Sequence, residues 1–180
     1  FFAHLTVYAQ LSWTTEDLSK YLGYTNYSNF HNLTEDEKWA VSAYGFTDET
    51  DYQDINGYLR SGDSYDLYNQ TKKSVEKLIS DIISTADKLP RIPQDLVTYR
   101  GFKLNWRNNK CFKKGEVLSD KAFVSTTLNK QVANHFAFNM DEGKGAFLTI
   151  KFLKEQKGVL ITEYDEDEIL LMPGRIIRIT

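Results

Sequence analysis

The chain has 180 residues, of which 41% are hydrophobic, and a formal net charge of −3. This length suits one domain that buries well over half of its unfolded surface. The acidic balance argues against broad binding to nucleic acid or to a membrane surface, because phosphate groups demand an excess of Lys and Arg. No apolar run reaches the roughly 18 residues that cross a bilayer. Cys111 is the only cysteine, which excludes an intrachain disulfide and multi-cysteine zinc sites.

The first half of the chain has a helical pattern. Thr34 followed by Glu37 forms a capping box and predicts a helix over 35–44. A stripe of apolar residues with a 3.6-residue period predicts a second helix over 72–88, which ends before Pro90.

Two other segments of this half have weaker patterns. Residues 52–60 are typical of a short helix or turn, interrupted at Asn56-Gly57. Residues 1–30 are rich in aromatic side chains and fit a lid, a partner-facing segment or a boundary remnant.

After Pro93 the pattern changes to short strands rich in β-branched and aromatic residues, with one helix predicted over 130–138. The predicted strands are 96–102, 122–128, 146–153, 159–162, 168–172 and 176–179. We therefore predict one α+β domain over 1–180, with a helical part at 1–92 packed on a mixed or antiparallel two-sheet β-core at 93–180.

Two carboxylates precede the predicted strand 168–172. Strand alternation places Glu166 and Glu168 on one face, with Cα atoms about 7 Å apart. One acid could stabilise a developing cation while the other removes a proton from an attacking group. The run 163–168 is also typical of a solvated acidic turn. A calcium loop is a further alternative, but it fails on spacing, because Glu168 stands where that loop needs glycine.

A cation and a hydroxyl cluster lie on two other predicted strands. Arg100 offers a rigid fork of donors suited to a diphosphate, and Gly101 permits close approach to the backbone. Ser125 begins a Ser-Thr-Thr run and could fix the rotamer of a catalytic acid. The alternatives are an ordinary surface ion pair for Arg100 and helix capping for the hydroxyls.

Other chemistry finds little support. The three histidines are scattered, with no Ser/His/Asp order and no HExxH motif, so hydrolase triads and zinc peptidases fit poorly. There is no GxGxxG motif and no P-loop, so a dinucleotide would not be held in the Rossmann manner.

The order of these motifs resembles the bacterial mono-ADP-ribosyltransferase toxins of the Arg-Ser-Glu class, most closely the iota-toxin-like and Rho-modifying exoenzyme branches. The shared features are Tyr99-Arg100, the Ser-Thr-Thr run from Ser125, and Glu-x-Glu before an apolar strand. Residues 54–60 resemble the helical segment of those enzymes that ends in Asn-x-Tyr-Leu-Arg, and Phe136 stands where relatives place an aromatic.

The resemblance implies a role for each matching residue. Arg100, beside Tyr99, would bind the phosphates and nicotinamide ribose of NAD, and the backbone of Gly101 would bind the carboxamide. Phe136 would pack on nicotinamide. Ser125 would orient Glu168.

The same resemblance implies the chemistry at the acidic pair. Glu168 would bind the ribose 2′-hydroxyl and stabilise the oxocarbenium ion, and Glu166 would position and deprotonate the acceptor. Tyr164 would take part in substrate recognition, although it lies two residues before Glu166 where relatives have three. Relatives with this first Glu usually modify arginine.

The implied function is transfer of ADP-ribose from NAD, without a metal, to an arginine of a host protein, with actin as one candidate. Such an enzyme would be a secreted bacterial toxin or effector that acts in the host-cell cytosol. Two alternatives stay open: an NAD glycohydrolase on the same fold, and a non-catalytic module whose acidic turn docks a basic partner.

Overall fold

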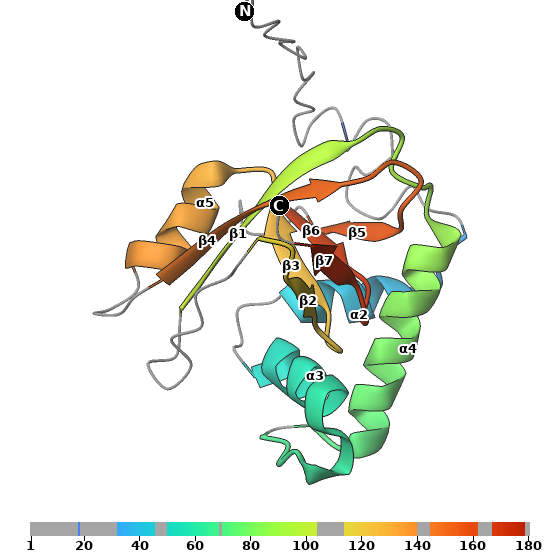
Figure 1. Ribbon diagram of the computed structural model, residues 1–180. Coiled ribbons are helices and arrows are strands. Elements are labelled where there is room, and N and C mark those ends of the chain that lie inside the picture. The colour runs from blue at the N-terminus through green and yellow to red at the C-terminus, as the bar shows by residue number, and fades with distance from the viewer. Residues whose placement is uncertain are drawn as a thin grey trace, which may run out of the picture.

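The computed structural model describes residues 18, 32–45, 50–68, 70–103, 114–139, 145–161 and 167–178. Within these ranges, the strands form a five-stranded sheet of order β4-β1-β3-β6-β5 and a two-stranded sheet of β2 and β7 (Figure 1). Every strand pair described is antiparallel. The strands are β1 (Leu96–Lys103), β2 (Val117–Ser119), β3 (Val124–Thr127), β4 (Gly145–Phe152), β5 (Gly158–Ile161), β6 (Glu168–Leu171) and β7 (Ile176–Arg178).

The helices fall into two groups in Figure 1. The first comprises α2 (Glu35–Gly45), α3 (Thr50–Ser61) and α4 (Lys72–Lys88), with the short 3₁₀ helix η1 (Gly62–Ser64) after α3. These helices contact one another, and α2 and α4 also contact β5. The second group is α5 (Lys130–Asn134) with the π-helix η3 (His135–Asn139), which packs on β1 and β4.

The capping box at the start of α2 is confirmed in atomic detail. The backbone N–H of Thr34 donates to Glu37 Oε2 at 2.8 Å, and the N–H of Glu37 donates to Thr34 Oγ1 at 3.2 Å. Two donors that the first turn would otherwise leave unsatisfied are thereby paired. The helix begins at Glu35 as predicted and ends at Gly45.

The predicted helix over 72–88 is also confirmed, with Thr71 as its N-cap. Its buried face lies in the main core, together with residues from β5 and β6. Ile83, which the sequence pattern placed on the apolar stripe, is instead 38% exposed. It lies one residue past the buried Ile82, so the stripe is narrower than the pattern suggested.

The predicted interruption at Asn56-Gly57 is wrong, because α3 runs continuously through both residues. Asn56 is buried and its side chain is hydrogen-bonded at both ends. A Cβ on Gly57 would lie 2.2 Å from the ring of Tyr65, so this glycine lets the aromatic ring pack against the helix. Tertiary contacts therefore override the weak helix propensity of both residues.

Two further elements differ from prediction. The strand β2 has only three residues and was not predicted; it pairs with β7, far away in sequence. The helix predicted over 130–138 is α-helical only to Asn134 and then continues as the π-helix η3.

The predicted α+β class with two sheets is confirmed, and the described strand pairs are antiparallel rather than mixed. The helices α2, α4, α5 and η3 contact the five-stranded sheet. The part of 1–30 that the structure describes is Leu18, which lies fully buried in the core, so the possible roles of this segment fall outside the described residues. Among the described helices, none combines the length and apolar character that a membrane span requires.

Candidate functional site

The three strands that carry the predicted motifs are consecutive neighbours in the five-stranded sheet. β1 carries Arg100, β3 carries Ser125 and β6 begins at Glu168. In the register of these strands, Tyr99 lies opposite Thr127, and Thr127 lies opposite Glu168. Two interstrand spacings, about 10 Å, therefore separate the Tyr99 and Glu168 backbones. Segments far apart in sequence are brought side by side.

Arg100 is a largely buried cation at the centre of this group. Its Nη1 donates to the backbone carbonyl of Ser125 at 2.6 Å, and its guanidinium carbon lies 6.0 Å from the ring centroid of Phe102. Burial is the main cause that lowers the pKa of Arg100, and the nearby Asp120 and Glu168 oppose it. The surrounding protein therefore solvates this guanidinium less well than water would.

Glu168 is a buried carboxylate, only 7% exposed. It lies opposite Thr127, whereas Ser125 lies opposite Leu170, two residues further along β6. Because directly paired residues share a face, Ser125 and Glu168 are diagonal neighbours on one face of the sheet. The contact recorded for Ser125 runs through its carbonyl oxygen. Its predicted role in orienting Glu168 stays a prediction.

Gly101 has a clear packing role. A Cβ at this position would lie 1.7 Å from the backbone oxygen of Ala133 on α5, so the helix packs directly on the strand. Gly145 on β4 is in the same situation, with the oxygen of Ala137 at 1.6 Å. These two glycines let α5 and η3 lie against β1 and β4, which by itself accounts for a glycine after Arg100.

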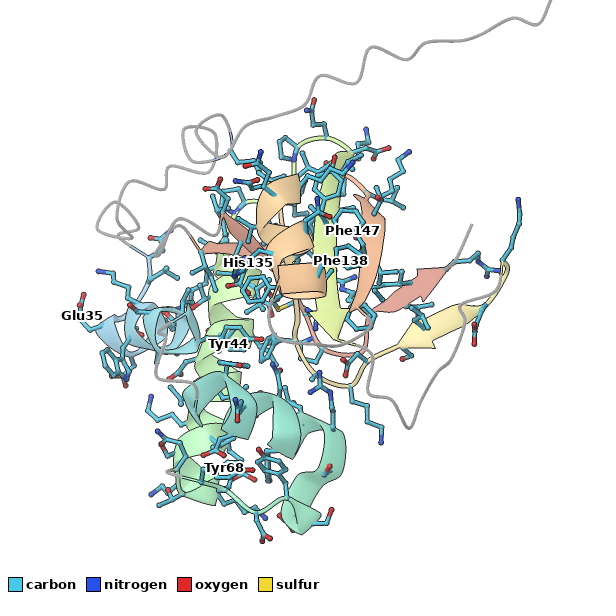
Figure 2. The ribbon with its side chains drawn as sticks, turned by 90° about the vertical axis from the view of Figure 1, so that its left-hand side faces the viewer. Glu35, Tyr44, Tyr68, His135, Phe138 and Phe147 are labelled. Carbon is cyan, nitrogen blue, oxygen red and sulfur yellow. The ribbon has the colours of Figure 1, made fainter. Side chains whose placement is uncertain are left out.

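The aromatic residues near this helix are only partly buried. The rings of Tyr99 and Phe147 lie 5.8 Å apart across β1 and β4. Phe136 lies on η3 and is 37% exposed, in edge contact with the ring of His135. Figure 2 shows His135, Phe138 and Phe147 on this flank of the molecule. An exposed ring here is open to a ligand.

The helical half contributes a residue that sequence reasoning missed. Tyr44 of α2 is 5% exposed and packs edge-on against the ring of Phe123, with centroids 5.6 Å apart. Burial raises the pKa of Tyr44 and the charge of Glu168 raises it further, while Arg100 and Arg60 act in the opposite direction. Tyr44 therefore belongs electrostatically to the group around Arg100 and Glu168.

Arg60, at the end of α3, is a second cation of this group. It forms a two-pronged ion pair with Asp120, with Nε–Oδ1 at 3.0 Å and Nη2–Oδ2 at 2.8 Å. Asp120 raises the pKa of Arg60, and Arg60 in turn contributes to lowering that of Arg100. The sequence of residues 54–60 resembles the toxins, but that resemblance did not predict that Arg60 lies close to Arg100.

Two of the predicted residues, Tyr164 and Glu166, lie outside the described residues. The part of the chain that the structure describes holds no cluster of three or more His, Cys, Asp or Glu side chains that could bind a metal ion. The strands β1 and β6 therefore carry a largely buried cation and a buried carboxylate on either side of β3, and a partly exposed aromatic ring lies on η3, which packs on β1.

Comparison with known proteins gives a consistent result. Residues 19–180 match the family model for the ADP-ribosyltransferase exoenzymes. Vis from Vibrio splendidus is 27% identical over 173 residues, covering 92% of this chain; the match spans 66% of Vis, just under two thirds of its length.

Solved structures agree on the fold. Vis in complex with agmatine matches with a TM-score of 0.65 and 27% identity, covering 92% of this chain and 76% of that chain. The C. perfringens toxin BECa with NADH matches with a TM-score of 0.62 over 90% of this chain and 39% of BECa, but at 23% identity it supports the fold alone. With the family model matched over nearly the whole sequence, the chain belongs to the ADP-ribosyltransferase exoenzyme family.

Proposed function

We propose that this domain is a mono-ADP-ribosyltransferase that cleaves NAD and transfers ADP-ribose to an arginine side chain of a protein. The single observation that carries the proposal is the adjacency of β1, β3 and β6, the strands on which Arg100, Ser125 and Glu168 lie. Family membership supports it, as does Vis, whose name proposes NAD(+)–arginine ADP-ribosyltransferase activity for that protein.

Arg100 is proposed to bind the diphosphate and the nicotinamide ribose of NAD. Its recorded polar contact is with a carbonyl oxygen, and burial lowers its pKa. A diphosphate would supply the countercharge that this guanidinium lacks in that contact, with the two-pronged geometry that arginine favours. The backbone of Gly101 would bind the carboxamide, with Tyr99 and Phe136 contributing aromatic surface for the nicotinamide.

Glu168 is proposed to accept a hydrogen bond from the ribose 2′-hydroxyl and to stabilise the positive charge that develops on the sugar. The bond between the ribose C1′ and the nicotinamide nitrogen breaks, and nicotinamide leaves with the bonding electron pair. A guanidinium nitrogen of the acceptor forms the new bond to C1′ as it loses a proton to Glu166. Ser125 would hold Glu168 in the required rotamer.

The acceptor is proposed to be arginine because Glu166 precedes Glu168. A protonated guanidinium is a poor nucleophile and needs a nearby base. The complex of Vis with agmatine, itself a small guanidine, fits this choice. Tyr164 would help recognise the protein substrate, for which actin is one candidate. We expect a secreted toxin or effector that acts in the host-cell cytosol.

Labelled NAD separates the three candidate functions. The protein is incubated with NAD labelled in its adenosine part, once with agmatine and once with a eukaryotic cell lysate. We expect labelled agmatine and a labelled protein band whose modification maps to arginine. Free ADP-ribose alone would instead favour the glycohydrolase, and unchanged NAD would favour the non-catalytic module and contradict the proposal.

The Glu166→Gln variant tests the assignment of the acceptor base in the same assay. We expect transfer to agmatine to fall below detection while NAD hydrolysis remains, because water needs less help than a guanidinium. Equal loss of both reactions would contradict this role of Glu166.

A further inference from the structure

A buried hydrogen-bond relay connects the helical half to the catalytic strands. Asn56 of α3 donates from Nδ2 to the hydroxyl oxygen of Tyr44 at 2.8 Å. Its Oδ1 accepts the backbone N–H of Phe123, the residue before β3, at 3.1 Å. Asn56 is 8% exposed and Tyr44 is 5% exposed, so neither relies on water for these contacts.

The relay has only one possible direction. A backbone N–H can only donate, so the Asn56 atom facing Phe123 must be the amide oxygen, and the amide nitrogen must face Tyr44. That nitrogen can only donate, so the phenol oxygen of Tyr44 is the acceptor. The proton of the phenol is therefore turned away from Asn56.

The surrounding charges determine where that proton points. Within the described part of the chain, no acceptor is recorded for the Tyr44 hydroxyl proton. The charges that act on this hydroxyl are the negative Glu168 and the positive Arg100 and Arg60. A hydroxyl dipole orients in the surrounding field, which favours a proton directed toward the negative charge. Figure 2 places Tyr44 at the junction between the helices and the β-core.

We propose that Asn56 is a positioning residue that directs the Tyr44 hydroxyl, as a hydrogen-bond donor, toward the Glu168 side of the site. The inference rests on the proposed function, since it concerns the same cleavage of NAD. By accepting the N–H of Phe123, Asn56 also fixes the start of β3, the strand that carries Ser125. A hydroxyl that donates to the Glu168 side can hold this carboxylate in place before the reaction, and such preorganisation lowers the barrier.

Two near-isosteric changes test the relay. Tyr44→Phe keeps the ring against Phe123 but removes the donor. Asn56→Asp keeps the acceptor for Phe123 but replaces the donating nitrogen with an oxygen, so the Tyr44 proton would turn to the carboxylate. We expect each to lower kcat for NAD hydrolysis by about tenfold or more, with KM for NAD changed by less than about threefold.

The double variant separates a relay from two independent defects. If Asn56 acts through Tyr44, Asn56→Asp should cause almost no further loss of kcat in the Tyr44→Phe background. Tyr58→Phe is the matched control, because that partly buried phenol also bonds a side chain, Glu76 at 2.6 Å, but through an exposed hydrogen bond. It should leave kcat unchanged.

The outcomes are distinct. Wild-type protein that does not cleave NAD would overturn the proposed function itself. An active wild type with an unchanged Tyr44→Phe variant would overturn only the relay, as would an equal loss from Asn56→Asp in both backgrounds. All rates are compared at a temperature where melting curves show each variant folded, and should Asn56→Asp not fold, the kcat of Tyr44→Phe decides alone.

Discussion

Two regions of the molecule bury charged side chains but differ in the partners that they provide for the charge. At the α2–α4 interface, Glu37 of α2 receives Lys88 Nζ on both carboxylate oxygens, at 2.6 and 2.8 Å, and Ser84 Oγ at 2.6 Å. On β1 of the five-stranded sheet, Arg100 instead donates to the backbone carbonyl of Ser125 on the neighbouring β3. Among the described residues, Glu37 has a matching ion pair, whereas Arg100 has none.

The pKa values express the same contrast. Hydrogen bonds from Lys88, Ser84 and Thr34 outweigh burial and lower the pKa of Glu37 to about 2, which favours its charged form. Burial also lowers the pKa of Arg100, but for a cation this disfavours the charged form. A structural ion pair stabilises the folded state, whereas an incompletely compensated cation is typical of a site that awaits an anion.

The largest effect is expected from the backbone packing beneath the site. Gly101→Ala should lower the free energy of unfolding by about 3 kcal/mol or more, because the new methyl meets the backbone oxygen of Ala133, which cannot move alone. Chemical denaturation measures the change.

Gly158→Ala is the matched control for that substitution. Its Cβ would meet side-chain atoms of Phe152 and Ile169 at 3.2 and 3.3 Å, which can adjust, so the loss should be nearer 1 kcal/mol. Equal losses at both positions would show that close approach of α5 to β1 is not what requires a glycine after Arg100.

A smaller effect, dependent on pH, is expected at the α2–α4 interface. Glu37→Gln places an amide against Lys88 and should lower the free energy of unfolding at pH 7 by about 2 kcal/mol, after allowing for the partial exposure of Lys88. Since the pKa of Glu37 falls from 4.5 to about 2 on folding, its contribution is present above pH 4.5 and is lost as pH falls toward 2.

Denaturation of both proteins at pH 7 and pH 3 tests this dependence. We expect the difference between wild type and Glu37→Gln to shrink at the lower pH. A difference that stays constant would mean that packing, rather than the carboxylate charge, sets the contribution of Glu37.

The smallest change in stability is expected at Arg100 itself. Arg100→Met replaces a desolvated cation with an apolar chain, so the free energy of unfolding should change by less than about 1 kcal/mol. The rise in melting temperature on adding NAD should, however, disappear.

Arg91→Met is the matched control for Arg100, since Arg91 also donates to a backbone carbonyl, that of Glu155, but at an exposed position. It should keep the thermal shift with NAD. If Arg100→Met is strongly destabilising and still shows that shift, then Arg100 belongs with Glu37 as a structural charge.

Local signals predicted much of this molecule. The capping box and the apolar stripe fixed α2 and α4 almost to the residue, because both signals lie within a single helix. The ends of the predicted strands lie within about two residues of the observed ends, because the pattern of β-branched and aromatic residues also lies within each strand. The order of the motifs also led to β1, β3 and β6, whose adjacency the structure then provided.

What the sequence could not predict depends on distant contacts. The partner of Glu37 lies 51 residues away, and β2 is defined only by pairing with β7. The continuity of α3 through Asn56 and Gly57 depends on Tyr44, Phe123 and Tyr65, none of which is a helical neighbour. Tyr44 is likewise linked to Arg100 and Glu168 only through the tertiary fold, so no local pattern could have predicted this proximity.

The central claim is that Arg100 and Glu168 act on one NAD molecule, and NAD hydrolysis by the Glu168→Gln variant tests it most directly. The substitution keeps the shape of a buried side chain and removes its charge. We predict a loss of at least about 100-fold in kcat for both hydrolysis and transfer, with the melting curve preserved. A folded Glu168→Gln variant that cleaves NAD at the wild-type rate would contradict the account.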